Sequence, residues 1–242
     1  MLYFWAILSG ILPALILVAF IYWQDKYQHE PIGWIAKSFW FGILACAGAM
    51  LLEILLPEPD YSTLSGDLYY SFVVIAFSEE IMKYLFFWFL VSRNPYFDER
   101  MDGIVYAACV GMGFAGFENI GYLLLNLDNL AMLGIARGLL SVPGHFFYAV
   151  FMGYYYSLAI YGSRRHRRLY YLLAFLVPFL FHGTFDSAVL AADLSETHMM
   201  VAAAVFIVLF VVMGIFVRRH MMRLLRADNK LIHKKGLKEK SV

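Results

Sequence analysis

Ionisable side chains occur in this sequence at positions surrounded by long apolar runs, and their types suit acid–base chemistry. A carboxylate in apolar surroundings can act as a general base toward water near neutral pH. A histidine can donate a hydrogen bond to a developing oxyanion or protonate a leaving amine. Together these groups suffice for hydrolysis of a peptide bond. The groups inside apolar runs are Glu79, Glu80, Lys83, Glu118, His145, His182 and Asp186.

The spacing of these residues pairs them on helical faces. Glu79 and Lys83 are four residues apart, and Glu80 and Lys83 are three apart. On a helix, one lysine can therefore neutralise either carboxylate. His182 and Asp186 are also four residues apart, which lets the carboxylate orient the imidazole.

Each group taken alone has a plainer interpretation. Glu80 and Lys83 could form a structural ion pair, and a single His145 is often a packing residue. Glu118 and its neighbour Asn119 could merely hydrogen-bond to adjacent helices. The set as a whole favours function, because four helices would bring polar groups to one depth at a high insertion cost.

The elements that must position these residues are membrane helices. The sequence is 62% hydrophobic and 15% charged, whereas a soluble domain carries about a quarter charged residues. We predict an all-α, polytopic membrane protein of about seven transmembrane helices, organised as one domain over residues 1–217 and a basic tail over 218–242. Since a span needs about 20 apolar residues, we place spans near 2–23, 33–56, 68–92, 103–125, 138–161, 169–191 and 199–217.

Charge in the connecting segments predicts the orientation. Basic residues occur in alternate loops and in the tail, and acidic residues occur in the others, with Arg137 as the clear exception. The positive-inside rule then places the N-terminus outside and the C-terminus in the cytoplasm. The basic segments carry Lys26, Lys37, Arg93, Arg100, Arg164, Arg165, Arg167 and Arg168, and the acidic ones carry Glu58, Asp60, Asp67, Asp128, Asp193 and Glu196.

The basic tail favours an anchor at the inner leaflet over nucleic-acid binding. Nine of the 19 Lys and Arg residues lie between Arg218 and Lys240, directly after the last predicted span. On the opposite side of the bilayer, the ionisable groups lie about five to eleven residues below the outer ends of their spans, or roughly 8–17 Å at 1.5 Å per residue. The predicted site is therefore nearer the outer face.

Four segments together resemble the PrsW family of intramembrane proteases, which is similar to the CAAX prenyl endopeptidases and bacterial abortive-infection proteases. They are SEEIMK at 78–83, GFENIGY at 116–122, PGH at 143–145 and HGTFD at 182–186. The sequence departs from that wider group in having Lys83 after two intervening residues and Asp186 in the place of an asparagine. No F-x-x-x-H ends at His145, where the fourth residue before the histidine is Ser141, so the assignment of His145 to that motif is an inference.

The resemblance implies site-1 cleavage of a single-pass membrane anti-sigma factor, near the extracytoplasmic side of a bacterial cytoplasmic membrane, in a stress response. It also implies roles for individual residues. Glu79 would activate water, Glu80 would be held by Lys83, His145 and His182 would complete the site, Asp186 would orient His182, and Glu118 and Asn119 would support them.

The metal content of such a site stays open from the sequence. With neutral histidines, four carboxylates face one lysine, a net charge of three negatives that protonation or a divalent cation would relieve. Glu79, His145 and His182 would be suitable zinc ligands, although we favour a metal-independent glutamate mechanism. The alternatives are a seven-helix zinc-dependent membrane hydrolase and a proton-coupled transporter, the latter disfavoured by the lack of related halves.

Overall fold

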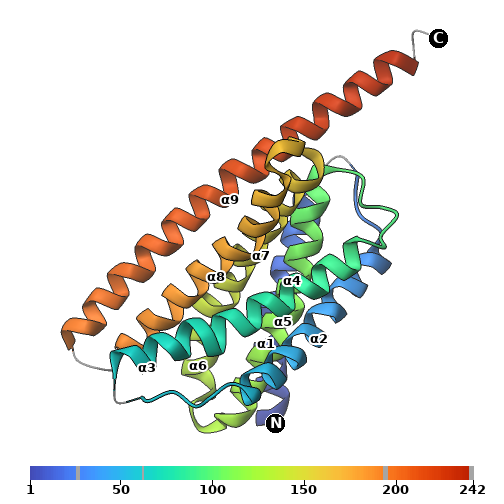
Figure 1. Ribbon diagram of the computed structural model, residues 1–242. Helices are drawn as coiled ribbons and strands as arrows, with labels where there is room; N and C mark the ends of the chain where they lie inside the picture. The colour runs from blue at the N-terminus through green and yellow to red at the C-terminus, as the bar shows by residue number, and fades with distance from the viewer. Residues whose placement is uncertain (26–27, 62, 193–195, 240–242) are drawn as a thin grey trace.

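The computed structural model describes residues 1–25, 28–61, 63–192 and 196–239, and within them the chain is helical with no strand (Figure 1). The all-α prediction is confirmed. The elements in chain order are α1 (Leu2–Gln24), α2 (Ile32–Leu55), α3 (Leu64–Tyr69), η1 (Tyr70–Phe77), α4 (Ser78–Val91), α5 (Arg100–Leu125), η2 (Leu127–Asn129), α6 (Leu130–Ala136), η3 (Arg137–Ser141), α7 (Val142–Tyr161), η4 (Arg164–His166), α8 (Arg167–Ala192) and α9 (Glu196–Glu239).

Among the described residues, six helical stretches are long and apolar enough to cross a membrane. They are Leu2–Gln24, Ile32–Leu55, Arg100–Leu125, Leu127–Tyr161, Arg164–Ala191 and Met199–Lys230. The helix over α3, η1 and α4 covers the predicted span 68–92 up to Val91, but three charged residues interrupt its apolar character. Its neighbours must shield those charges from lipid. The count of seven spans and the orientation of the termini stay predictions.

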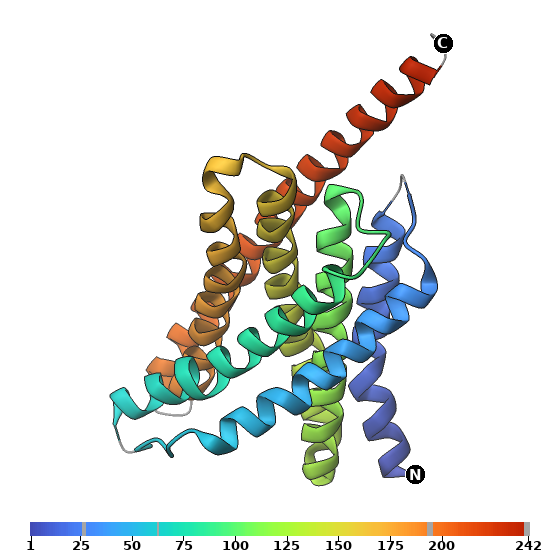
Figure 2. The same cartoon turned by 45° about the vertical axis from the view of Figure 1, so that its right-hand side comes forward.

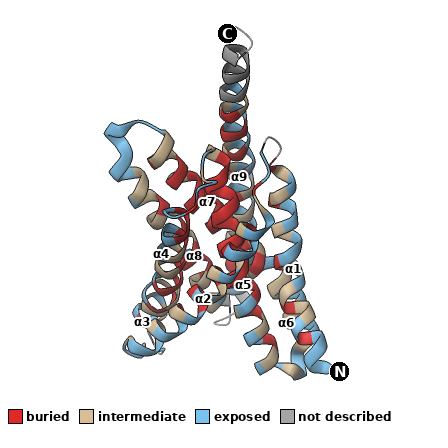
Figure 3. Cartoon of the chain, turned by 90° about the vertical axis from the view of Figure 1, so that its right-hand side faces the viewer, coloured by how far each residue is buried: buried red, intermediate tan, exposed pale blue. Residues whose placement is uncertain are grey.

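Helix α5 forms the centre of the bundle and packs against α1, α2 and α7. Figure 3 shows that buried residues concentrate on α5 and α7. Glycines permit this close approach: a Cβ on Gly113 would collide with the backbone of Phe39 in α2, and one on Gly153 would collide with Gly103. Small residues at helix contacts let membrane helices pack closely, so α5 can hold its neighbours at fixed positions.

Helix α2 and the stretch α3–η1–α4 are inclined to α1 and α5 (Figure 2). Two π-helical segments, η1 and η3, come directly before α4 and α7. In η3 the cause is local, since Pro143 has no N–H to continue the α-helical ladder. Such wide turns change the face that the following residues present, and they are frequent at functional sites. Glu79 and His145 follow these two segments within four residues.

Helix α9 is a long, continuous helix whose C-terminal part extends beyond the bundle (Figures 1 and 2). It runs through residue 218, where we place the boundary between the membrane domain and the tail, so the predicted tail continues the same helix. The side chains of 192–198 and 231–242 are outside the described residues. The predicted acidic loop with Asp193 and Glu196, and the last lysines of the tail, fall there.

Candidate active site

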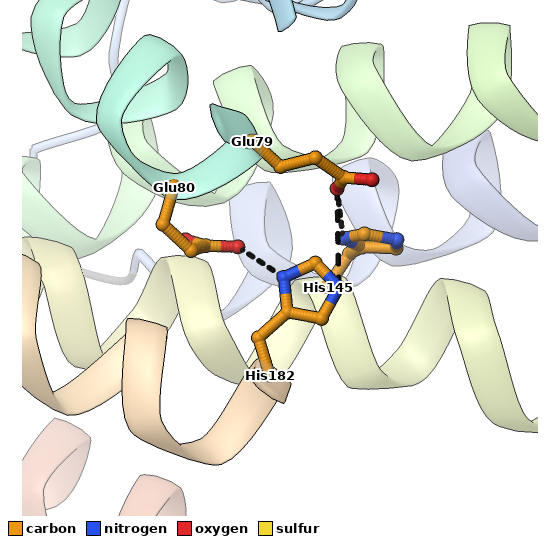
Figure 4. Close-up of side chains that lie close together, drawn as sticks. All are labelled: Glu79, Glu80, His145 and His182. Atoms are coloured by element: carbon orange, nitrogen blue, oxygen red, sulfur yellow. Dashed lines mark hydrogen bonds and ion pairs between the residues drawn. The ribbon is translucent and has the colours of Figure 1, made fainter. Parts of the chain in front are cut away.

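Three helices bring the predicted ionisable residues together inside the bundle. Glu79 and Glu80 come from α4, His145 from α7 and His182 from α8, and one ligand-type atom from each lies within 4.8 Å of the others. Figure 4 shows these four side chains pointing toward one another. None is more than 5% exposed. The local pairs expected from sequence spacing thus become one buried cluster.

Lys83 forms ion pairs with two of these carboxylates and fixes the protonation of one histidine. Its Nζ lies 3.0 Å from Glu79 Oε2, 2.9 Å from Glu80 Oε1 and 2.9 Å from His145 Nδ1. It also lies 3.9 Å from the centre of the Phe114 ring. An ammonium group has three N–H donors and no acceptor. His145 Nδ1 therefore accepts, and neutral His145 carries its proton on Nε2.

That Nε2 faces a second ion pair. It lies 3.1 Å from Glu118 Oε2, and Glu118 Oε1 lies 2.9 Å from the Arg137 guanidinium. Arg137 Nε donates to the Asn119 side-chain oxygen at 2.7 Å, and Asn119 donates to the Gly10 carbonyl at 3.3 Å. The residues predicted to support the site therefore link it to α1.

His182 is held between two carboxylates on α4 and α8. Its Nδ1 lies 2.9 Å from Glu80 Oε1, and its Nε2 lies 3.3 Å from Asp186 Oδ2 and 3.9 Å from Glu79 Oε2. The ring of Tyr148 stacks on it, with centroids 4.8 Å apart. Since Nδ1 donates to Glu80, a neutral His182 would present a lone pair to Asp186. A proton or another cation must therefore lie between His182 Nε2 and Asp186.

Arg137 is the residue of this site that sequence reasoning missed. We class it as an exception among acidic outer loops, whereas the structure places it beside Glu118 and stacks it on Tyr122 at 3.8 Å. Its position as an isolated cation in an otherwise acidic segment is the available signal. With Arg137 counted, two cations face the four carboxylates, so the net charge with neutral histidines is two negatives.

A cavity of about 280 Å³ opens beside the cluster, and Glu79, Glu118, Arg137, His145, His182 and Asp186 line it. Tyr148 also lines it, and its buried hydroxyl has no hydrogen-bond partner among the described residues. A neighbouring cavity of about 480 Å³ shares Glu79 and Glu118 with the first and is otherwise mostly apolar. The arrangement therefore offers a base, imidazoles and a free hydroxyl around space that can receive a peptide.

The model of the PrsW family intramembrane metalloproteases matches residues 30–213 of this chain. The chain belongs to the PrsW protease family. It is 36% identical over 186 residues to Protease PrsW of Geobacillus kaustophilus, which covers 76% of this chain and 80% of that protein. The corresponding protein of Clostridioides difficile is 37% identical over 182 residues, covering 74% and 76%. Protease PrsW of Bacillus subtilis is 33% identical over 178 residues, covering 74% and 79%. No solved structure matches.

The predicted resemblance to PrsW is therefore confirmed, and with it a multi-pass membrane protease of the bacterial cell membrane. The matched range contains every residue of the cluster described above. Membership favours the protease over the transporter and the zinc-dependent hydrolase that the sequence leaves as alternatives. The roles of the individual residues stay predictions, as does the catalytic type.

The donor set of this PrsW family site fits a divalent metal. Glu79, His145 and His182 supply oxygen and nitrogen donors of the kind that zinc takes. Both histidines also point their other nitrogen at a carboxylate, Glu118 for His145 and Glu80 for His182. This outer carboxylate–histidine pairing is typical of metal-ligating histidines. Lys83, however, contacts Glu79 and His145 Nδ1, so a metal would share these atoms with an ammonium group.

Proposed function

We propose that this membrane protease hydrolyses a peptide bond of a single-pass membrane protein near the extracytoplasmic side of the membrane. The supporting observation is the buried cluster of Glu79, Lys83, His145 and His182 beside a cavity. Family resemblance extends the proposal to the substrate class, an anti-sigma factor, and to site-1 cleavage in a stress response.

In this proposal Glu79 is the general base. Glu79 lines the cavity, and its Oε2 accepts a hydrogen bond from Lys83 at 3.0 Å and lies 3.9 Å from His182 Nε2. Glu79 takes a proton from water while the water oxygen bonds to the scissile carbonyl carbon. That proton is then passed to the amide nitrogen as the carbon–nitrogen bond breaks, giving a carboxylate and an amine.

Histidine and tyrosine stabilise the negative charge that develops on the carbonyl oxygen. His182 lines the cavity and donates its Nδ1–H to Glu80; in the protonated ring, Nε2–H beside Asp186 is a second donor that can serve the oxyanion. Tyr148 lines the same cavity and its hydroxyl has no partner among the described residues, so it can donate to the oxyanion. His145 helps to position Glu79 through Lys83, which contacts both.

We favour the metal-independent version, because Lys83 already bridges Glu79, Glu80 and His145 as an internal cation. If a metal is bound, Glu79, His145 and His182 would hold it, and Glu80 and Glu118 would hold the outer N–H groups of the histidines. Such a metal would supply Lewis-acid polarisation and lower the pKa of a bound water.

The test is cleavage in proteoliposomes with a panel of single-pass substrates. Replacing Glu79 with glutamine, or His182 with alanine, should lower the cleavage rate by about 10²–10⁴-fold, the usual contribution of a general acid or base. Glu58→Gln is the matched control, since Glu58 is exposed in the loop after α2. Undiminished cleavage by the Glu79→Gln protein would refute the assignment of the base.

The same preparations decide the catalytic type. Elemental analysis of the purified protein, together with cleavage assays after chelation and after readdition of zinc, distinguishes the metal-independent glutamate mechanism from a metalloprotease mechanism. We expect less than stoichiometric metal and no loss of cleavage on chelation. Stoichiometric zinc that disappears in both His145→Ala and His182→Ala would replace the glutamate version with a metalloprotease, while leaving the protease itself in place.

A further inference from the structure

A groove of about 730 Å³ runs between α1, α7 and α9, separate from the residues that line the two cavities at the active site. One rim carries three arginines of α9, Arg218, Arg219 and Arg226. The other walls include Phe20 of α1 together with Phe146 and Phe147 of α7. We propose that this groove binds an anionic phospholipid of the inner leaflet.

The three arginines form an anion-binding rim. Arg219 and Arg226 are seven residues apart and therefore lie on one face of α9, with Arg218 beside them. All three are exposed, and none pairs with a carboxylate of the described residues. The nearest acid in the sequence, Asp228, instead accepts from Arg100 and from the backbone of Met101. Guanidinium groups bind phosphate through paired hydrogen bonds, so an anion would relieve the repulsion along this rim.

The remaining walls suit acyl chains. Phe146 is buried at 3% exposure and makes an edge-to-face contact with Phe20 at 6.1 Å. A Cβ on Gly214 would meet no atom within 4 Å, so the α9 wall of the groove has open space at this residue. An apolar tail can therefore lie between aromatic side chains of α1 and α7 and the apolar residues Val217, Met221 and Met222 of α9.

The order of these features along α9 matches the order of a phospholipid. Apolar residues continue to Val217, and the arginines begin at Arg218, where the last predicted span ends. A lipid with its phosphate at Arg218 and Arg219 would place its chains toward Gly214, inside the hydrocarbon region. Basic pockets between membrane helices on the cytoplasmic side are a known setting for anionic headgroups. The choice of the inner leaflet follows from the predicted cytoplasmic C-terminus.

The test uses the full chain in nanodiscs that contain equal amounts of phosphatidylglycerol and phosphatidylcholine, with native mass spectrometry of the lipid retained on release. Wild type should keep phosphatidylglycerol in preference to phosphatidylcholine. Replacing Arg218, Arg219 and Arg226 by glutamine should lower that preference at least tenfold. The control replaces Arg164, Arg165 and Arg168, three exposed arginines in and beside η4, and should retain the preference.

A second variant, Gly214→Trp, fills the groove without changing its charge. It should lose the retained lipid while its thermal unfolding stays close to wild type, because the glycine faces open space. An equal loss of phosphatidylglycerol in the η4 control would reduce the effect to general surface charge and overturn the proposal. Unchanged retention in Gly214→Trp would overturn it as well, since the anion would then need no groove.

Discussion

Two buried clusters of ionisable side chains occur in the part of the chain that the structure describes, and they balance their charges in different ways. At the active site, Glu79 and Glu80 contact Lys83, and Glu118 contacts Arg137. The second group, here called the α5 N-terminal cluster, has four carboxylates that are at most 2% exposed and one arginine. Its members are Asp25, Glu30, Asp102, Asp228, Tyr106 and Arg100.

In the α5 N-terminal cluster, Arg100 pairs with Asp228, whereas neutral donors face Asp102 and Glu30. Asp102 accepts the backbone N–H groups of Asp98 at 2.8 Å and Glu99 at 2.6 Å, which closes a capping box at the start of α5. Glu30 accepts the hydroxyl of Tyr106. Neither oxygen of Asp25 has a hydrogen-bond partner among the described residues. Burial, followed by the nearby Glu30, raises the pKa of Asp25 to about 7.

The difference shows two solutions to the cost of burying a carboxylate. Internal cations let the active site keep charged groups next to the space where chemistry would occur. In the α5 N-terminal cluster, proton uptake by a carboxyl group lowers the cost of its burial, because no chemistry there requires the charged carboxylate. Glu118 and Asp102 are sixteen residues apart on α5, or roughly 24 Å along the helix. At this distance the two clusters should respond to mutation independently.

The largest effect is expected where an internal cation is removed. Lys83→Met leaves Glu79 and Glu80 without their shared partner, which should cost about 3–5 kcal/mol of unfolding free energy and abolish cleavage. Chemical unfolding in detergent micelles measures the first effect. The control is Lys37→Met, because Lys37 is exposed and its contacts among the described residues are cation–π contacts with Trp34 and Phe41. A double variant with Glu80→Gln should regain part of the loss.

A smaller effect is expected from Arg137→Gln. It breaks a partly buried ion pair with Glu118 and the hydrogen bond to Asn119. Since Glu118 faces His145, we expect cleavage to fall about 10–100-fold, or roughly 1.4–2.7 kcal/mol of barrier. Arg137→Lys keeps the charge and should recover part of the rate, whereas Arg164→Gln should have no effect. Wild-type rates in Arg137→Gln would show that Glu118 needs no cation.

The sequence was sufficient to predict the local part of the active site. Residues three or four apart on one helix share a face, so the contacts of Lys83 with Glu79 and Glu80, and of His182 with Asp186, follow from spacing. The meeting of α4, α7 and α8 could be expected only from the common depth of their polar residues and the family motifs. The contact of Lys83 with His145 Nδ1 depends on helix packing that periodicity does not specify.

The α5 N-terminal cluster could not be predicted in this way. Asp25, Glu30 and Asp102 lie outside the predicted spans, where acidic residues are normally solvated. Their burial depends on distant parts of the chain, since Asp228 of α9 reaches the first residues of α5. Arg137 illustrates the same limit at the active site, because its partner Glu118 is nineteen residues earlier, on α5.

The pH dependence of stability should distinguish the two clusters. The folded pKa of Asp25 is raised to about 7 from 3.8, so its stabilising contribution is complete below pH 3.8 and is lost as pH rises through 7. Asp25→Asn should remove this dependence and raise the unfolding free energy at pH 8 by about 1–3 kcal/mol. Thermal unfolding between pH 5 and 8 measures it, with Glu58→Gln as an exposed control. An unchanged pH slope would mean that Asp25 is solvated.

The smallest effect is expected from Tyr106→Phe, which removes one neutral donor from Glu30. Burial raises the pKa of Glu30, so the carboxyl group can take up a proton when it loses the hydroxyl. The loss in unfolding free energy should therefore be about 1 kcal/mol, as for one hydrogen bond, and should shrink from pH 8 to pH 5. Glu80 differs in this respect, because its contacts with both Lys83 and His182 favour the charged form. Suppose instead that Tyr106→Phe lowers the unfolding free energy as much as Lys83→Met does, and equally at every pH. That result would show that Glu30 is held in its charged form and that the two clusters stabilise their carboxylates in the same way.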